Sequence, residues 1–485
     1  MSLANHEPVR HPTSSGRTVK SKEDGMKPTA FFLTALACLS FSVAPFAGAA
    51  KAELRLSLDE AIQYALAHNR DLAKGELSLK GGQLAVDSAK SAFDLRVIPS
   101  TQLSADSSSE RTWMTGVRGS KMLVNGISAS VNPSMGEWGG TPYSMVSVGL
   151  DMPLLRGLGR EYAMAGVDAS LYALQSAQLA YYAQQVSIVL RTVQSVYDIV
   201  QRHEQINLLT GQEKLVKHHL EIVKIKERAG LAEAMDAYRA EIRVKTLEDD
   251  VTVRRQELAD ALGELKKLLA IPQKGVVTIS APLDYAPFVI KSDEAMAIAM
   301  KNRIDVLQSQ RQEKESERQL RLAKNNLLPQ LNLQLNYNRS GNNRSFDLDQ
   351  ETWLATVTSD NDLFRTAEKN AYQQQLLQYQ GMKLDQETLR ENVSQEVRSE
   401  IGNIDKHRQR IALLEEQLRQ THGKMLLAES KFRNGMADNF ALLEAQEQMQ
   451  RARTELFAER IAAIVGLYRF RSVLGTLLAR EDGER

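Results

Sequence analysis

The sequence has little of several residue types, and each shortage excludes a class of structure. One cysteine, Cys38, in 485 residues excludes a disulfide framework and any zinc or iron–sulfur site built on cysteines. The 61 basic and 60 acidic side chains nearly cancel, so there is no global positive field to favour nucleic acid as a partner. After the N-terminal region no apolar run approaches the roughly 18 residues of a membrane-spanning helix. If that part of the chain spans a membrane, it must do so as strands in a closed barrel.

Proline is also scarce, and its placement is informative. The chain has 12 prolines, and none lies in residues 154–271 or 330–485. Because proline is the strongest helix breaker, these stretches are free to form very long helices. A continuous helix over residues 161–229 would span about 100 Å at ~1.5 Å per residue, which is too long for one compact domain.

Apolar residues in these stretches recur at the alternating spacings of three and four that are typical of coiled coils. Such narrow stripes favour packing against neighbouring helices over burial in a broad globular core. The clearest examples are Val186, Val189, Val193, Val196 and Val200, and in the second half Val397, Ile401, Ile404, Ile411, Leu414 and Leu418.

The N-terminal region has the layout of a secretory signal peptide. Residues 31–49 form a short apolar run that follows Lys27 and ends in Ala47, Gly48 and Ala49. We therefore expect residues 1–49 to be a leader, with Met26 as a possible true start. A membrane anchor and lipidation of Cys38 are the alternatives.

The chain repeats itself. The triplet at residues 59–61 recurs at 293–295, an offset of 234, and farther on the residues around Gly230 recur around Gly435, an offset of 205. The change of offset means that the first copy carries about 29 extra residues, which we place around residues 112–139. We expect a first repeat at 50–290 and a second at 291–485.

Each repeat has the same predicted order, namely a helix, short strands, a very long helix, a glycine turn and another helix. Alternating apolar and polar residues indicate the strands, and Asn125-Gly126 is typical of a two-residue hairpin turn. The first repeat then has strands at about 97–153, a long helix at 160–229, and a helix at 234–271 before a linker. The second has strands at about 330–363, a long helix at 366–433 and a helix at 437–479.

Six segments resemble the TolC-like outer membrane efflux family, in order and twice over. The first-helix segments are LSLDEAIQYALAHNRDL (56–72) and SDEAMAIAMKNRIDVL (292–307). The entry to and the return from the strands are AKNNLLPQLNLQLNY (323–337) and VGLDMPLLRGLGR (148–160). The glycine turns are KERAGLAEAMDAYRAE (226–241) and KFRNGMADNFALLEAQ (431–446).

The resemblance implies a mainly α fold with a β-barrel portion. A homotrimer would have four strands per protomer in a shared 12-strand barrel, set in outer membrane lipid, above an α-helical tunnel of coiled-coil helices in the periplasm. Four strand regions cannot close a pore alone, which independently calls for symmetric assembly. The implied function is a passive exit duct of a tripartite efflux pump or type I secretion system, gated at its periplasmic end. Its partners would be a periplasmic adaptor protein and an inner-membrane transporter of the RND or ABC type.

In the family, the glycine turns lie at the periplasmic tip, where the adaptor docks and the tunnel narrows. The resemblance makes Asp236, Arg239 and Glu444, each tripled by symmetry, the candidate gate. The alternative is a solvated helix face with local i, i+3 pairing. The tip residues expected to contact the adaptor are Arg228, Gly230, Leu231, Arg433, Gly435 and Met436.

The sequence offers no catalytic, cofactor-binding or metal-binding constellation. The eight histidines have no ligand spacing, and phosphate-binding glycine loops are absent. We therefore expect no enzyme activity, no cofactor and no metal. The rival hypothesis is a periplasmic coiled-coil adaptor or scaffold without a pore, which does not explain strands at matching places in both copies. Five aromatic residues in the strand regions suit either membrane-interface girdles or half-buried packing: Trp113, Trp138, Tyr143, Tyr337 and Trp353.

Overall fold

The structure is a computed structural model that describes residues 54–105, 111–230, 233–284, 290–434, 436 and 439–479. The chain divides into two units, Met1–Ala50 and Lys51–Arg485. The expected leader, with Met26 and Cys38, lies outside the described residues. Everything below concerns the second unit.

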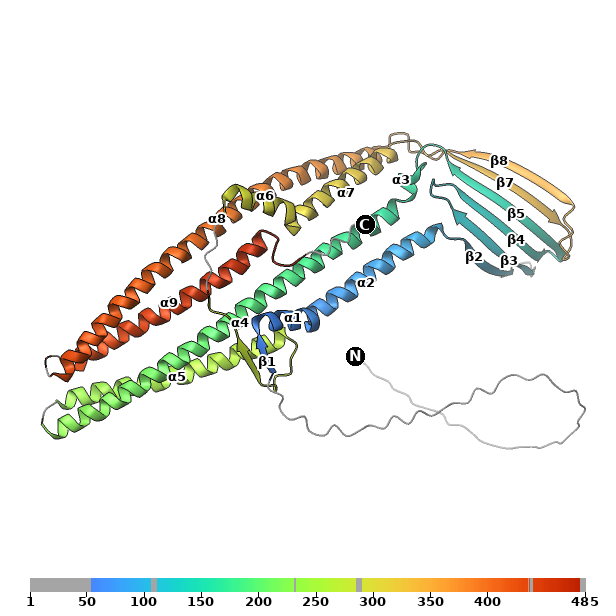
Figure 1. The fold of residues 1–485 in the computed structure, drawn as a ribbon. Helices are drawn as coiled ribbons and strands as arrows, with labels where there is room; N and C mark the ends of the chain where they lie inside the picture. Colours follow the sequence, from blue (N-terminus) through green and yellow to red (C-terminus); the bar gives the residue numbers. More distant parts are fainter. Residues whose placement is uncertain are drawn as a thin grey trace, which may run out of the picture. The chain divides into compact units, whose positions relative to one another are not determined.

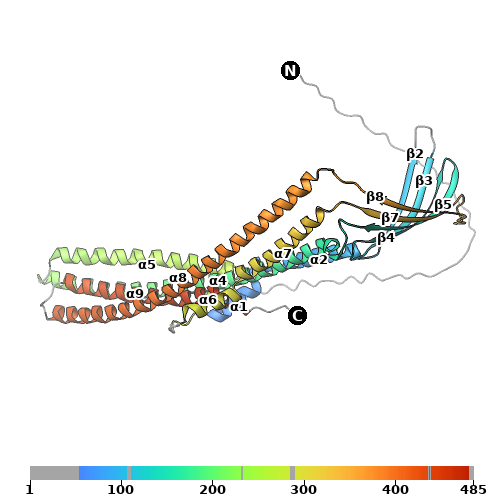
Figure 2. The same cartoon turned by 90° about the horizontal axis from the view of Figure 1, so that it is seen from above.

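Four long helices dominate this unit, and they confirm the very long helices expected from the proline-free stretches (Figure 1). The longest two, α4 and α8, have 64 and 68 residues. They are α4 (Ala165–Arg228), α5 (Ala234–Leu268), α8 (Thr366–Arg433) and α9 (Asn439–Val473). Each pair, α4 with α5 and α8 with α9, is an antiparallel hairpin, and both hairpins end in tips at the end of the unit opposite the strands (Figures 1 and 2).

Shorter helices precede the strands in both halves, and they are broken at equivalent places. The α1 helix begins with a capping box, in which the Ser57 N–H donates to Glu60 Oε2 at 2.8 Å and the Glu60 N–H donates to Ser57 Oγ at 3.3 Å. Extended backbone at Asn69 and at Arg303, 234 residues apart, separates the helices of each half. The duplication seen in the sequence is therefore present in the fold. These helices are α1 (Leu58–His68), α2 (Arg70–Lys90), α6 (Ser292–Asn302) and α7 (Ile304–Asn326), while the one-turn helix α3 (Arg160–Ala163) follows the strands of the first half.

A six-stranded antiparallel sheet lies at one end of the helices, in the order β2-β3-β4-β5-β7-β8. The expectation of four strands per protomer was therefore wrong. The first half of the chain supplies four strands and the second half two. They are β2 (Arg96–Ala105), β3 (Arg111–Met122), β4 (Ser128–Trp138), β5 (Thr141–Pro153), β7 (Asn332–Gly341) and β8 (Gln350–Thr358). A small parallel pair, β1 (Leu54–Ser57) with β6 (Val277–Ser280), lies near the middle of the helices.

The two additional strands, β3 and β4, form a hairpin in the region where the sequence carries its extra residues. The sequence marked the turn between them, but Gly116 and Gly119 in β3, and Pro133 and Gly136 in β4, weaken the strand pattern, so it did not show that both strands join the main sheet. The turn lies at Asn125-Gly126 but has a three-residue loop, since the Leu123 N–H donates to Ile127 O at 2.8 Å. Gly126 takes the positive φ of 89° that this loop requires.

The largest core lies where α1, α4, α5 and α9 meet the small parallel sheet. Its centre is the coiled-coil stripe of α4, where Val193 and Val196 are fully buried. Tyr197 anchors the linker between the two halves by donating from its hydroxyl to Pro282 O at 2.9 Å. The stripe predicted from sequence thus fixes the middle of the helices, while the sheet and the tips are held by other contacts.

Candidate functional site

The six-stranded sheet has one polar and one apolar face, because side chains alternate along each strand and paired residues share a face. On one face, a row of paired residues crosses four strands and is polar throughout: Asn132, Ser147, Asn338 and Thr352. We call this the polar face. Its members include Ser100, Gln102, Ser120, Ser130, Asn132, Ser147, Gln334, Asn336, Asn338, Thr352 and Thr356.

The opposite side, which we call the apolar face, is lined by large hydrophobic side chains. A single row crosses all six strands through Val97, Gly119, Val131, Val148, Tyr337 and Trp353. Several of these side chains are strongly exposed, with Trp353 at 79% and Leu103 at 79%. A sheet with one polar and one apolar face suits a wall between water and lipid.

The aromatic residues considered from sequence divide between the two faces. Trp113, Tyr337 and Trp353 lie on the apolar face, where Trp113 is paired with Leu103 on one side and Glu137 on the other, and Tyr337 with Val148 and Trp353. Trp138 and Tyr143 share strand positions with the polar face. The interface-girdle hypothesis therefore applies to three of the five residues.

Close approaches between neighbouring strands require glycine at two positions in β3 and β4. A Cβ on Gly136 would lie 2.2 Å from Trp113 O and 2.9 Å from Cε1 of Tyr143, so only glycine fits there. A Cβ on Gly116 would likewise meet Pro133 O at 2.6 Å. Ser144 lies fully buried with no hydrogen-bond partner for Oγ. These glycines let the inserted hairpin pack tightly against its neighbours.

At the opposite end, the helix tips hold the residues predicted to contact an adaptor. Gly230 ends α4 with a φ of 69°, as expected for a glycine turn. Arg228 and Arg433 are exposed at the ends of α4 and α8, and Met436 is 70% exposed. Leu231 and Gly435 lie outside the described residues.

The three predicted gate residues lie near the tips, and each finds its partner within its own helical hairpin. Asp236 Oδ1 lies 4.0 Å from Nη1 of Arg239, one turn along α5. Glu444 on α9 accepts a hydrogen bond from Gln448 at 2.8 Å and lies 3.6 Å from Nζ of Lys424 on α8. The first pair matches the local i, i+3 alternative. Within one chain these contacts keep Glu444 apart from the Asp236–Arg239 pair.

Three contacts that the sequence did not reveal join one hairpin to the other near the tips. Arg243 on α5 donates from Nη2 to Glu447 Oε1 on α9 at 3.0 Å. On the other pair of helices, the buried His219 of α4 lies with its ring 5.4 Å from the Phe432 ring of α8. Lys226 places its ammonium 4.5 Å from the centre of the same ring, a cation–π contact. No sequence signal marks these pairs, because the partners lie about 200 residues apart.

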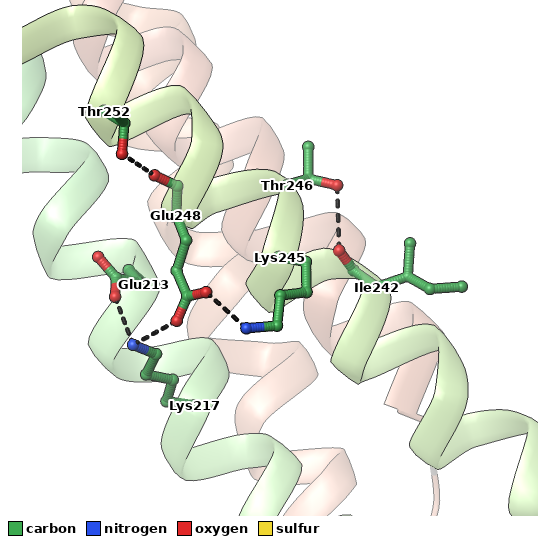
Figure 3. A network of polar contacts seen from close by, with 7 residues as sticks. All are labelled: Glu213, Lys217, Ile242, Lys245, Thr246, Glu248 and Thr252. Carbon is green, nitrogen blue, oxygen red and sulfur yellow. Dashed lines mark hydrogen bonds and ion pairs between the residues drawn. The ribbon is translucent and has the colours of Figure 1, made fainter.

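Within the first hairpin, a charged network ties α4 to α5 (Figure 3). Lys217 of α4 lies 2.6 Å from Glu213 and 2.8 Å from Glu248 of α5, and Lys245 lies 2.9 Å from the other oxygen of Glu248. Hydrogen bonds from these two lysines lower the pKa of Glu248 to about 2. The hydrogen bonds from Lys217 to Glu213 and to Glu248 raise its own pKa.

The part of the chain that the structure describes holds neither a metal-binding cluster nor a membrane-spanning helix. In that part of the chain no group of three or more His, Cys, Asp or Glu side chains is placed to hold a metal ion. None of the described helices is both long enough and apolar enough to cross a membrane.

Residues 61–270 and 296–476 each match the outer membrane efflux protein family. The chain belongs to this family. The two matches correspond to the two halves of the duplicated fold. No curated protein sequence matches the chain.

Solved structures of outer membrane channels have the same fold at low sequence identity. The CmeC channel of Campylobacter jejuni is 14% identical with a TM-score of 0.69, over 88% of this chain and 87% of that one. The open state of Neisseria gonorrhoeae MtrE is 15% identical with a TM-score of 0.68, over 87% and 89%. VceC of Vibrio cholerae is 15% identical with a TM-score of 0.67, over 86% and 96%.

Membership of the family identifies this protein as an outer membrane efflux channel with its helical part in the periplasm. The rival hypothesis of a periplasmic adaptor without a pore is therefore not supported. The family is one of channel proteins rather than enzymes.

Proposed function

We propose that three copies of this outer membrane efflux protein form the passive exit duct of a tripartite efflux pump or type I secretion system, gated at the helix tips. The observation that carries the proposal is the two-faced sheet continuing directly into long helices. The α2 and α7 helices lead into β2 and β7, while β5 and β8 lead back toward α4 and α8. A polar sheet face whose strands connect at one end to long helices is the construction a water-filled conduit requires.

Exposed apolar residues on the helices support assembly with further copies. Leu77 and Leu84 on α2 are exposed and seven residues apart, and so are Leu377 and Leu384 on α8. A heptad pair facing solvent on a long helix is a seam that needs a partner helix. Neighbouring copies of the chain in a closed ring supply that partner.

The tips support docking of a periplasmic adaptor. Met436 and Phe440 of the second hairpin, and Met235 and Tyr238 of the first, are all more than half exposed. Arg228 and Arg433 lie beside them, so each tip has exposed apolar side chains next to a cationic group. This combination fits a protein groove that covers the apolar residues and pairs with the arginines.

Within the duct, Asp236, Arg239 and Glu444 near the tips form the gate when tripled by symmetry. The duct itself does no chemistry and holds no cofactor. The energy for transport comes from an inner-membrane transporter of the RND or ABC type, and the adaptor couples the two.

Fractionation and conductance test the proposal together. The expected result is an oligomer in the outer membrane fraction that gives stepwise conductance in a planar lipid bilayer. A soluble periplasmic monomer that gives no conductance would overturn it.

A further inference from the structure

The sheet of one chain ends in two edges that complement each other. Among the described residues, the outer sides of β2 and β8 have no strand partner. Because six strands alternate in direction, β2 and β8 run antiparallel to each other. They are also similar in length, with 10 and 9 residues. The β8 edge of one copy can therefore pair with the β2 edge of the next copy in the alternation of the rest of the sheet.

The helices attached to these edges carry matching apolar seams. The two edge strands β2 and β8 are the ones joined to α2 and α8, the helices with the exposed leucine pairs described above. Joining β8 to β2 of the next copy brings the seam of Leu377 and Leu384 toward the seam of Leu77 and Leu84. One contact between copies thus covers both unpaired edges and both apolar seams.

The inserted hairpin of β3 and β4 is part of the six-stranded sheet, so it would add to the circumference of a ring formed by that sheet. Its strands lie inside the sheet, since β3 pairs with β2 and β4 pairs with β5 along nearly their full lengths. Both strands keep the alternation, with Ser120 and Ser130 on the polar face and Val117 and Val131 on the apolar face. Its turn is fixed at the junction with the helices, where the Gly159 N–H donates to Asn125 O at 3.1 Å.

We propose that the β2 and β8 edges pair between copies to close a ring of eighteen strands, six from each of three copies, with the inserted hairpin inside the wall. The proposal rests on the trimeric duct proposed above and replaces the twelve strands expected from sequence. With strands ~4.8 Å apart and tilted by about 40°, twelve strands give a backbone radius of about 12 Å and eighteen give about 18 Å. The wider ring is lined mainly by uncharged serine, threonine, asparagine and glutamine side chains. This end of the duct therefore admits bulky hydrophilic solutes with little selection by charge, and any selection falls to the helix tips.

Cysteine cross-linking in outer membranes tests the pairing, with Cys38→Ser as the background. Ser100→Cys on the polar face of β2 is combined in turn with Thr352→Cys, Leu354→Cys and Thr356→Cys on the same face of β8. We expect cross-links between copies for at least one of these combinations. The matched controls Trp353→Cys and Ala355→Cys lie on the apolar face and should give none.

A second position excludes the twelve-strand ring in which β2 and β3 lie outside the wall. If the ring had twelve strands, with β2 and β3 outside it, β8 would instead meet β4, and Asn132→Cys would link to β8 in place of Ser100→Cys. That result overturns the proposal, and so does a trimer without any link between β2 and β8. Electron cryomicroscopy of the particle gives an independent test, because the strands can be counted in a cross-section of the ring. Eighteen strands would support the proposal, and twelve would contradict it. Trimeric state and conductance are measured on the same samples. Loss of the trimer or of conductance would contradict the proposed duct, whereas a conducting trimer without the β2–β8 link would contradict only the eighteen-strand ring.

Discussion

Arg243 on α5 and Glu447 on α9 are joined by an ion pair of 3.0 Å between Nη2 and Oε1, although they lie on different halves of the duplicated chain. The same carboxylate oxygen also lies 3.0 Å from Nη2 of Arg451, one turn along its own helix. Glu447 thus has one partner that links the hairpins and one that does not. Any motion that separates the two hairpins at the tips must break the first contact and can keep the second.

Arg243→Ala should loosen the two hairpins and favour the open tip. For a partly exposed pair we expect about 0.5–1 kcal/mol, or roughly a two- to fivefold shift in the open fraction. Single-channel recording in planar bilayers measures that fraction. Arg451→Ala is the matched control, because it removes a partner of the same carboxylate within α9. Equal effects of the two substitutions would contradict a role for the inter-hairpin pair.

The double substitution of Asp236→Ala and Arg239→Ala should raise single-channel conductance, because it removes charged groups from the proposed constriction. The control is Glu264→Ala with Lys267→Ala, an i, i+3 pair on the same helix but far from the tip. Unchanged conductance in the tip variant would leave Asp236 and Arg239 as a local surface pair and remove them from the gate.

Glu248→Gln should lower the melting temperature of the helices modestly at pH 7. Because the pKa of Glu248 is lowered to about 2 from an ordinary 4.5, its stabilising effect is present above pH ~4.5 and is lost as the pH falls toward 2. The difference between native protein and variant, followed by circular dichroism, should therefore stay constant from pH 7 to ~4.5 and shrink below it. Asp250→Asn, an exposed acid on the same helix, serves as control. A difference that vanished already at pH 5 would argue against the lysine contacts.

The tip should become less stable in mild acid because of His219. Burial lowers the pKa of this histidine, and the nearby Lys226 and His218 lower it further. Above pH ~6.5 the ring is neutral in both folded and unfolded chains, and below that pH the unfolded chain takes up its proton first. Protease cleavage at the tip should accelerate as the pH falls from 7.5 to 5.5, and His219→Gln should abolish the acceleration. His203→Gln, at an exposed histidine farther along α4, should leave it intact, and equal behaviour of both variants would refute the assignment.

Gly136→Ala should impair assembly of the sheet, since its Cβ would clash with Trp113 O. We expect a cost of about 1–3 kcal/mol from such overpacking. Gly119→Ala is the control in the same hairpin, because its Cβ would meet Val131 O at an ordinary 3.7 Å. Protease-resistant protein in outer membranes reports the outcome. Equal yields for both variants would show that β3 and β4 are not packed as described.

Local and periodic features were readable from the sequence. The absence of proline from residues 154–271 and from residues 330–485 predicted the long helices, because backbone sterics act within a few residues. Constant offsets between Asp59 and Asp293 predicted the duplication, and the change of offset predicted an inserted segment in the first copy. Gly230 was predicted at a turn, since few residues other than glycine take its backbone angle at low cost.

Only the tertiary structure decided how the inserted segment is used and which residues meet near the tips. The sequence marked the turn between β3 and β4, but it did not show that both strands pair within the main sheet, since the glycines and Pro133 weaken their strand pattern. Likewise no local sequence pattern predicts the ion pair of Arg243 with Glu447 or the ring contact of His219 with Phe432, since packing of the two hairpins brings these residues together. The sequence by itself determined long duplicated helices with strands between them. The six-stranded, two-faced sheet and the contacts between hairpins depend on long-range register, which only the folded chain fixes.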